Sequence, residues 1–491
     1  MAFSTIIFIF GFLPIGLALY YVVPRKAKNV ILVLISLIFY AWGNPEYIVL
    51  MLFSILFNYF AGLQIASCLE HAPARANGAQ DQDTDGTSRM QTVKTPTAKL
   101  FLTIAVAINL LLLGFFKYYG FLVDNINALT GLSIGYTQLA LPIGISFFTF
   151  SVITYIADVY NGKAEAQRNI IEYALYVSFF PKVMSGPIVQ YHDMAAQLRD
   201  RSCFMEKFGD GARLFVVGLG KKVLIADCLN STFTAVSSLP SNGVSTLTAW
   251  LGCITYTLVI YFDFSGYSDM AIGIAKMFGF DISKNFDYPY ISKSATEFWR
   301  RWHISLGRFF RDYVYIPLGG NRVTVAKHIR NIAIVWLLTG FWHGAAWNFI
   351  FWGGFYGVLL LIEKYLLKDV VDRIPAAVQH IVALLLIMIG WVFFFSPTLG
   401  AGFVWLGQMF GIGASGFIDA TGSYYWGQSI ILVLIGAVGS TPLIARLGSR
   451  MVASKSRLTS IASVVGSLLV LVLSTAYMVN STYSTFLYFK F

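Results

Sequence analysis

The chain has 491 residues, of which 57% are hydrophobic and only 12% are charged, and its net charge is +11. Soluble domains carry roughly 25% charged residues, so this composition excludes an ordinary soluble domain. The positive charge is typical of the basic cytoplasmic loops of a membrane protein, and we do not read it as a nucleic-acid-binding surface.

Apolar segments follow one another along nearly the whole chain. A helix that crosses a membrane needs about 20 apolar residues, so we predict an all-α polytopic membrane protein with about 11 or 12 transmembrane helices, plus re-entrant and amphipathic helices. The candidate segments are 6–22, 30–42, 46–68, 98–118, 139–160, 213–228, 246–268, 329–343, 345–363, 376–396, 427–445 and 462–482.

Basic residues alternate between the predicted loops. The first segment is followed, not preceded, by Arg25, Lys26 and Lys28, which predicts a retained first span rather than a cleaved signal peptide. The positive-inside rule then places the basic loops, including 269–328, in the cytoplasm and both termini outside. The loops nearly free of Lys and Arg lie on the other side: 119–138, 229–245 and 397–426.

Two segments interrupt this pattern. Segment 70–97 is polar and has almost no large apolar residue, so it predicts a flexible cytoplasmic loop within a single transmembrane domain, 1–491. Segment 170–190 is apolar but broken by Pro181 and Pro187, which predicts a helix that enters the membrane and returns. We expect Lys182 in this segment to extend its charged end to the interface.

The densest charge lies in residues 297–322, "EFWRRWHISLGRFFRDYVYIPLGGNR". On one continuous helix over 297–314, at about 100° per residue, the charged residues share one face and the aromatic residues the other. The charged face suits lipid phosphates at a membrane surface. It contains Glu297, Arg300, Arg301, Arg308, Arg311 and Asp312, and the opposite side includes Phe298, Trp302 and Phe309.

Two of the six histidines lie in apolar, glycine-rich surroundings. On the predicted helix, His303 falls at the apolar border beside Gly307, which leaves space next to the imidazole. His343 lies deep in "LTGFWHGAAWNFIFWG", between Gly340 and Gly344. Ionisable residues in membrane segments are rare and point to function, and a neutral imidazole suits a general base, although a buried structural histidine is the alternative. The other histidines fall in or beside polar loops: His71, His192, His328 and His380.

Further polar residues receive structural predictions. Asp263 and Asp269 in "YFDFSGYSDM" are expected to pair with Arg300 or Arg301. The four cysteines include no C-x-x-C pair, so no metal site is predicted. The sequence also lacks a Walker loop, an H-E-x-x-H helix and a G-x-S-x-G elbow, which leaves base-assisted group transfer as the enzymatic option.

These segments together resemble a known family. The stretch from "YFDFSGYSDM" through "EFWRRWHISLGRFFRDYVYIPLGGNR" to "LTGFWHGAAWNFIFWG" resembles the membrane-bound O-acyltransferase (MBOAT) superfamily. The N-terminal "LPIGISFFTF" and "FFPKVMSGPI" are similar to its bacterial branch, which is typified by alginate O-acetyltransferase and the D-alanyl transferase of teichoic acids. The resemblance runs nearly from end to end.

The resemblance implies a ring of helices around a central tunnel, with His343 as the main catalytic residue and His303 as the second. It implies an acyl thioester donor from the cytoplasm, acetyl-CoA or another, and no bound cofactor. His343 would take the proton of an acceptor hydroxyl, and His303 would hydrogen-bond the carbonyl oxygen or orient the acceptor. Candidate binding residues are Arg300, Arg301, Arg308, Arg311, Asn348 and Trp302.

The same resemblance implies a multi-pass protein of the bacterial inner membrane, in contact with membrane lipids. Its expected partners are an extracytoplasmic acetyltransferase and the machinery that makes an extracellular polysaccharide such as alginate, with no nucleic acid. Two alternatives keep the fold: D-alanyl transfer to teichoic acid and peptidoglycan O-acetylation. A third is a transporter without chemistry, but no internal repeat supports it.

Overall fold

The computed structural model describes residues 2–43, 45–70, 94–137, 139–202, 204–367, 373–453 and 456–480. Every regular element within these ranges is a helix, which confirms the predicted all-α class. The chain divides into two compact units. One comprises Leu13–Phe204 and Phe278–Phe280, and the other comprises Ala2–Phe12, Met205–Met277 and Asp281–Phe491. The predicted loop at 70–97 falls almost wholly outside the described residues.

The first unit is built from long apolar helices and short broken ones. Its helix α5 is buried along most of its length and packs against α3, α4 and α8. The helices are α1 (Leu13–Val22), α2 (Lys28–Gly43), α3 (Ile48–Glu70), α4 (Pro96–Thr130), α5 (Ile145–Tyr160), α6 (Ile170–Ser178), α7 (Phe180–Val183) and α8 (Tyr191–Arg199).

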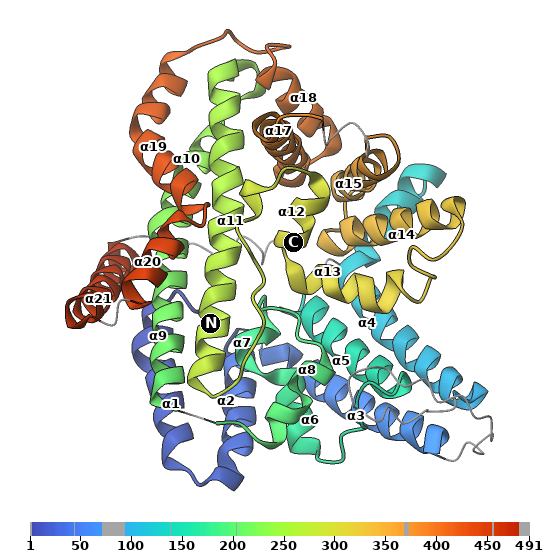
Figure 1. The fold of residues 1–491 in the computed structure, drawn as a ribbon. Coiled ribbons are helices and arrows are strands. Elements are labelled where there is room, and N and C mark those ends of the chain that lie inside the picture. Colours follow the sequence, from blue (N-terminus) through green and yellow to red (C-terminus); the bar gives the residue numbers. More distant parts are fainter. Residues whose placement is uncertain are drawn as a thin grey trace. The chain divides into compact units, whose positions relative to one another are not determined.

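The second unit is organised around α11, a long helix that is buried over most of its length (Figure 1). Helices α9, α10, α17, α18 and α19 all pack on it. The helices are α9 (Met205–Gly220), α10 (Cys228–Ser237), α11 (Thr246–Met277), α12 (Ala295–Arg301), α13 (Ile304–Phe310), α14 (Val325–His343), α15 (Trp347–Tyr365), α17 (Ala376–Phe395), α18 (Leu399–Met409), α19 (Ala420–Gly439), α20 (Leu443–Ala453) and α21 (Arg457–Asn480).

Several of these helices are long and apolar enough to cross a membrane. Six of the described helices meet that description, and the count reaches seven if α19 and α20, which meet at a bend of 63°, form one broken span. The other predicted segments coincide with shorter or less apolar helices. The chain is therefore a multi-pass membrane protein that combines long spans with shorter helices.

Local sequence signals explain where the helices begin and end. Helix α4 begins after Thr95, whose hydroxyl accepts a hydrogen bond from the backbone N–H of Ala98, and Pro96 occupies its first turn. Both features satisfy or remove backbone donors that have no partner at a helix start. The helix ends at Gly131, whose φ of 70° is the left-handed conformation that glycine adopts most readily.

The predicted re-entrant segment is broken as expected. Helix α6 stops at Ser178, α7 follows after a break at Phe179, and non-helical backbone leads to α8. The prediction for Lys182 is wrong, because its side chain does not reach a surface. Lys182 is 3% exposed, its Nζ donates to the hydroxyl of Ser151 at 3.0 Å, and it lies 4.2 Å from the ring of Tyr176.

Two glycine pairs bring α9 and α11 into direct backbone contact. A Cβ placed on Gly218 would lie 2.5 Å from the carbonyl oxygen of Gly266, and one on Gly211 would lie 2.6 Å from that of Gly273. In each helix the two glycines are seven residues apart, so they lie on one face and run antiparallel to the partner pair. Small residues at such an interface let membrane helices approach closely.

We expect Gly218→Ala to lower the melting temperature of the purified protein in detergent. The added methyl group meets backbone atoms of α11 that cannot rotate away, so the helices must separate, at a cost of about 1–3 kcal/mol. Gly209→Ala in the same helix is the matched control, because nothing lies within 4 Å of its Cβ position. An equal loss of melting temperature in both variants would contradict the close contact.

The close contact places two lysines beside the aspartates of α11. Lys221 and Lys222 begin a π-helical segment, Lys221–Asp227, that follows α9. The Nζ of Lys221 lies 2.6 Å from a carboxylate oxygen of Asp269, and that of Lys222 lies 2.7 Å from Asp263. The predicted pairing of these aspartates with Arg300 or Arg301 is therefore wrong. The lysines neutralise them instead, as buried carboxylates require.

Candidate active site

Residues 297–314 do not form one continuous helix, so that prediction is wrong. Helix α12 ends at Arg301, α13 begins at Ile304, and a π-helical segment, Arg311–Tyr315, follows α13. His303 lies at the break with φ 46° and ψ 52°. A residue other than glycine pays about 1–2 kcal/mol in this left-handed conformation, so surrounding contacts must hold it there.

The start of α12 is fixed by two acceptors. The hydroxyl of Ser294 accepts a hydrogen bond from the backbone N–H of Glu297. The carboxylate of Glu363, at the end of α15, accepts from the backbone N–H of Ala295 at 2.5 Å and from that of Thr296 at 2.9 Å. A negative charge at a helix N-terminus is stabilised by the helix dipole, so α15 anchors α12.

The break itself is held by the loop that precedes α12. The backbone N–H of Ile304 donates to the carbonyl oxygen of Asn285 at 2.9 Å, and that of Asp287 donates to the carbonyl oxygen of Arg301 at 2.9 Å. On the other side, the carbonyl oxygen of His303 accepts from the backbone N–H of Gly307 at 3.1 Å. The left-handed backbone of His303 is thus fixed from both ends.

His303 lies on the wall of a cavity of about 170 Å³. This volume is more than ten times the ~15 Å³ that a single water needs. The cavity confirms the predicted space beside Gly307, although the helix bends before it. The lining residues are Trp299, Trp302, His303, Leu306, Gly307, Phe310, Arg311, Tyr315, Val335, Trp336 and Thr339.

His343 ends α14 and is buried next to the same aromatic cluster. Its ring centroid lies 4.9 Å from those of Trp342 and Trp352 and 5.3 Å from that of Phe394. His303 approaches Trp342 as well, at 6.0 Å between ring centroids. Both predicted catalytic histidines therefore pack on one tryptophan, but only His303 is among the residues that line the cavity.

Glycines hold the end of α14 in place. A Cβ on Gly340 would lie 2.3 Å from the carbonyl oxygen of Phe349, and one on Gly353 would lie 2.3 Å from that of Trp336. Helices α14 and α15 therefore approach each other at backbone distance one turn before His343. Larger residues at either glycine would push this histidine away from α15.

Burial keeps His303 neutral. Its side chain is 1% exposed and lies outside the helices that are long enough to cross a membrane. Burial disfavours the charged imidazolium and lowers the pKa of His303 to about 3. Near neutral pH, its imidazole therefore has one protonated nitrogen and one nitrogen with a free electron pair.

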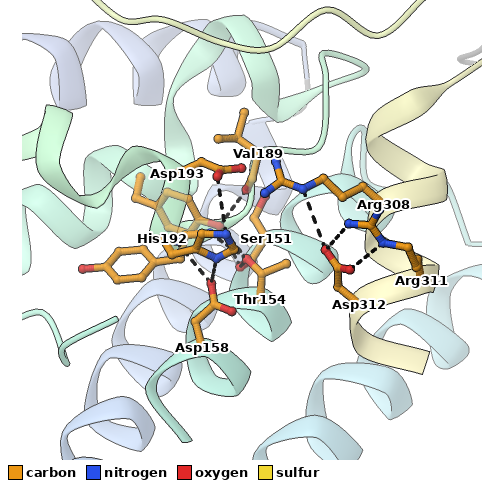
Figure 2. Close-up of polar contacts among 11 residues, drawn as sticks. Ser151, Thr154, Asp158, Val189, His192, Asp193, Arg308, Arg311 and Asp312 are labelled. Atoms are coloured by element: carbon orange, nitrogen blue, oxygen red, sulfur yellow. Dashed lines mark hydrogen bonds and ion pairs between the residues drawn. The ribbon is translucent and has the colours of Figure 1, made fainter. Parts of the chain in front are cut away.

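The predicted binding arginines are mostly paired with carboxylates. In Figure 2 the guanidinium groups of Arg308 and Arg311 both point to Asp312, and Arg311 Nε lies 2.8 Å from its Oδ1. Arg301 pairs with Glu297 at 2.9 Å. Arg300 is exposed, and no ion pair involves it within the described residues. Arg311 alone among these arginines lines the cavity.

Two further predicted residues have different surroundings. Trp302 is 3% exposed and lines the cavity. The side-chain amide of Asn348 donates to the carbonyl oxygens of Phe393 at 3.2 Å and Ser396 at 3.0 Å, which ties α15 to the end of α17. Trp299, which was not predicted, lines the cavity, and its buried indole N–H has no acceptor among the described residues.

Two of the histidines predicted to lie in or beside polar loops make hydrogen bonds with other side chains. His328 is 3% exposed, and its ring nitrogens lie 2.8 Å from the hydroxyl of Tyr315 and 2.6 Å from that of Tyr365. In the first unit, His192 is partly buried, and its Nδ1 lies 2.9 Å from the carboxylate of Asp158 (Figure 2). The partners are distant in sequence, so no local motif signals these pairs.

The amino-acid sequence is similar to a protein family and to several of its members. The family model described as "MBOAT, membrane-bound O-acyltransferase family" matches residues 81–403. A "Probable alginate O-acetylase AlgI" of Azotobacter vinelandii is 41% identical over 84% of this chain and 79% of its own length. A "Peptidoglycan O-acetyltransferase" of Helicobacter pylori is 35% identical over 84% of this chain and 80% of its own length. A "Teichoic acid D-alanyltransferase" of Bacillus subtilis is 29% identical over 46% of this chain and 60% of its own length.

Proposed function

The chain belongs to the membrane-bound O-acyltransferase family, and on that premise we propose that it carries acetyl groups toward hydroxyls of an extracellular polysaccharide such as alginate. The donor is a cytoplasmic acyl thioester, acetyl-CoA. The observation that carries the proposal is a neutral, buried histidine, His303, on the wall of a small aromatic cavity. A neutral imidazole beside an apolar acyl pocket suits transfer between a thioester and a hydroxyl.

The residues that line the cavity favour an acetyl group over a D-alanyl group as the acyl group that is transferred. None of the cavity's lining residues is acidic, and Asp312, next to the lining residue Arg311, is already paired with Arg308 and Arg311. A D-alanyl group carries an ammonium, which would lose its hydration there without gaining a carboxylate partner. An acetyl group carries no charge. The alginate-type relatives also match this chain over a larger share of its length than the D-alanyl transferases do.

In the proposed reaction, His343 takes the proton of the acceptor hydroxyl as its oxygen attacks the thioester carbonyl carbon. The C–S bond breaks, and the leaving thiolate takes up the proton from His343, which returns to its neutral form. The negative charge that develops on the carbonyl oxygen needs a hydrogen-bond donor. The indole N–H of Trp299 is a donor on the cavity wall and supplies it. His303 orients the substrate beside it.

The remaining assignments follow from the same proposal. Arg300 and Arg311 face the donor's phosphates, because Arg300 has no ion pair within the described residues and Arg311 borders the cavity. Other predicted binding residues, Arg301, Arg308, Asn348 and Trp302, hold the site in shape through the contacts described above. The protein lies in the bacterial inner membrane and passes the acetyl group to an extracytoplasmic acetyltransferase and the polysaccharide machinery.

Radiolabelled donors test the proposal. Membranes that contain the protein, incubated with acetyl-labelled acetyl-CoA, are expected to transfer label to polysaccharide or to a partner protein in an ester that alkali removes. Membranes without the protein are the control. A D-alanyl label offered as a carrier-protein thioester is expected to give no ester. Transfer of the alanyl label, or no protein-dependent acetyl label, would contradict the assignment.

A further inference from the structure

The side chain of Asn285 makes a polar contact with the His303 ring. Its Oδ1 lies 3.2 Å from His303 Nδ1, and Asn285 is 1% exposed. The same oxygen accepts a hydrogen bond from the backbone N–H of Ser305 at 3.1 Å and from its hydroxyl at 2.9 Å. The amide nitrogen of Asn285 points to the hydroxyl of Ser268 at 3.3 Å.

These contacts settle which atom of the amide faces the histidine. Oxygen and nitrogen of an asparagine side chain are assigned from their hydrogen-bond partners. The backbone N–H of Ser305 is a donor in every state, so the atom that receives it must be the oxygen. With the oxygen in that position, His303 Nδ1 approaches an acceptor and has to carry the proton. Since the imidazole is neutral, the electron pair then lies on Nε2.

We propose that Asn285 is a positioning residue that holds His303 as the Nδ1–H tautomer, so that Nε2 accepts a hydrogen bond from the substrate. The proposal rests on the proposed function for the reaction itself, but the tautomer stands on these contacts alone. This tautomer changes the role of His303, because an unprotonated Nε2 cannot donate a hydrogen bond to the carbonyl oxygen of the acyl group. The group that His303 holds must carry a hydrogen.

Two substrate groups have that chemistry. One is a hydroxyl of the acceptor, and the other is an amide N–H in the arm of an acyl thioester. Both are donors that a neutral imidazole nitrogen recognises. The strained backbone of His303 fits this role, because the Asn285 carbonyl holds Ile304 while the Asn285 side chain holds the ring. One residue therefore sets both the position and the proton of the histidine.

The tautomer can be measured directly by ¹⁵N NMR on full-length protein with labelled histidine in lipid nanodiscs. Protonated and bare imidazole nitrogens give well-separated ¹⁵N signals, and the spectrum of His303→Gln identifies the His303 signals among the six histidines. We expect the His303 imidazole of the wild-type protein without substrate to have a protonated Nδ1 and an unprotonated Nε2. A wild-type protein with the proton on Nε2 would overturn the proposal, whether or not the protein transfers acetyl.

Asn285→Leu removes the acceptor. We expect His303 to change to a mixture of tautomers and kcat/KM for acetyl transfer to fall about 10- to 100-fold, as expected when a buried hydrogen-bond acceptor is lost. Asn331→Leu is the matched control: Asn331 is also buried in this unit, but its amide donates to the carbonyl oxygens of Leu318 and Gly320. It should leave the His303 tautomer unchanged. An unchanged tautomer in Asn285→Leu would refute the role of Asn285.

Asn285→Asp keeps an acceptor for the Ser305 backbone and therefore keeps the fold if the leucine variant does not. Its carboxylate stabilises the imidazolium, so the pKa of His303 rises and the acidic limb of kcat/KM moves to higher pH. No movement of that limb would argue against contact between the two residues.

A separate NMR experiment distinguishes the acceptor hydroxyl from the amide N–H of the acyl thioester. Acetyl-CoA alone or a polysaccharide acceptor alone is added to the wild-type protein, and only the ligand that donates the hydrogen bond shifts the His303 Nε2 signal.

Discussion

His343→Gln is expected to lower acetyl transfer by about 10²- to 10⁴-fold while the amount of protein in the membrane stays at the wild-type level. Glutamine is neutral and similar in size, so it keeps most of the packing against Trp342, Trp352 and Phe394. It has no nitrogen that accepts a proton near neutral pH. The measurement is the rate of label transfer from acetyl-CoA per unit of purified protein, with the melting temperature recorded in parallel.

His380→Gln is the control for this prediction. His380 is partly buried in α17, and its Nδ1 lies 3.0 Å from the carbonyl oxygen of Ser292, so the substitution also removes an imidazole with one backbone partner. Its transfer rate should match the wild type. Full activity in His343→Gln would refute the assignment of proton transfer to His343, and an equal loss in both variants would indicate a structural effect.

Filling the cavity beside His303 is expected to produce the second large effect. Gly307→Leu places a side chain toward the cavity that His303 and Phe310 also line. The nearest atom to a Cβ on Gly307 is the carbonyl oxygen of Trp299 at 4.0 Å, so the Cβ itself meets no clash. The leucine then occupies the space proposed for the acyl group. We expect KM for acetyl-CoA to rise and kcat/KM to fall about 100-fold, as for a misplaced reacting group.

Gly427→Leu in α19 is the matched control, because nothing lies within 4 Å of its Cβ position and the residue is exposed. It should change neither KM nor kcat. Gly307→Ala supplies an intermediate step, with a smaller rise in KM than the leucine gives. A leucine variant with wild-type KM and a wild-type melting temperature would show that the acyl group binds elsewhere.

The family and the two histidines were predictable from the sequence because they depend on motifs read along the chain. Long apolar segments located the helices, and "FWHG" with "RWHISL" located His343 and His303. The space beside His303 was also predictable, since a glycine one turn from a large side chain leaves room. The structure places His303 and Gly307 on the same cavity wall.

The break at His303 could not be predicted in the same way. Residues 297–314 contain no proline, and the single glycine, Gly307, lies within α13 rather than at the break. Helix propensity therefore favours one continuous helix. The break depends on Asn285, which lies in a loop before α12 and binds the backbone of Ile304. A contact between distant residues overrides the local preference.

The predicted partners of Asp263 and Asp269 were wrong for the same reason, because the true partners are set by contacts between residues distant in the sequence. Asp263 and Asp269 were expected to find arginines, whereas consecutive lysines at the start of a π-helical segment neutralise them. Nothing in the local sequence of α11 selects lysine over arginine as a partner. The selection comes from the glycine contacts between α9 and α11, which bring the segment after α9 within reach.

The anchoring of α12 by Glu363 also sets an order of events during synthesis. The carboxylate that binds the N-terminus of α12 lies 68 residues after Ala295 in the chain. While the ribosome makes α12, α13 and α14, the backbone N–H groups of Ala295 and Thr296 lack this carboxylate acceptor. A nascent chain that stops before residue 363 therefore holds both histidines but lacks the carboxylate that anchors α12.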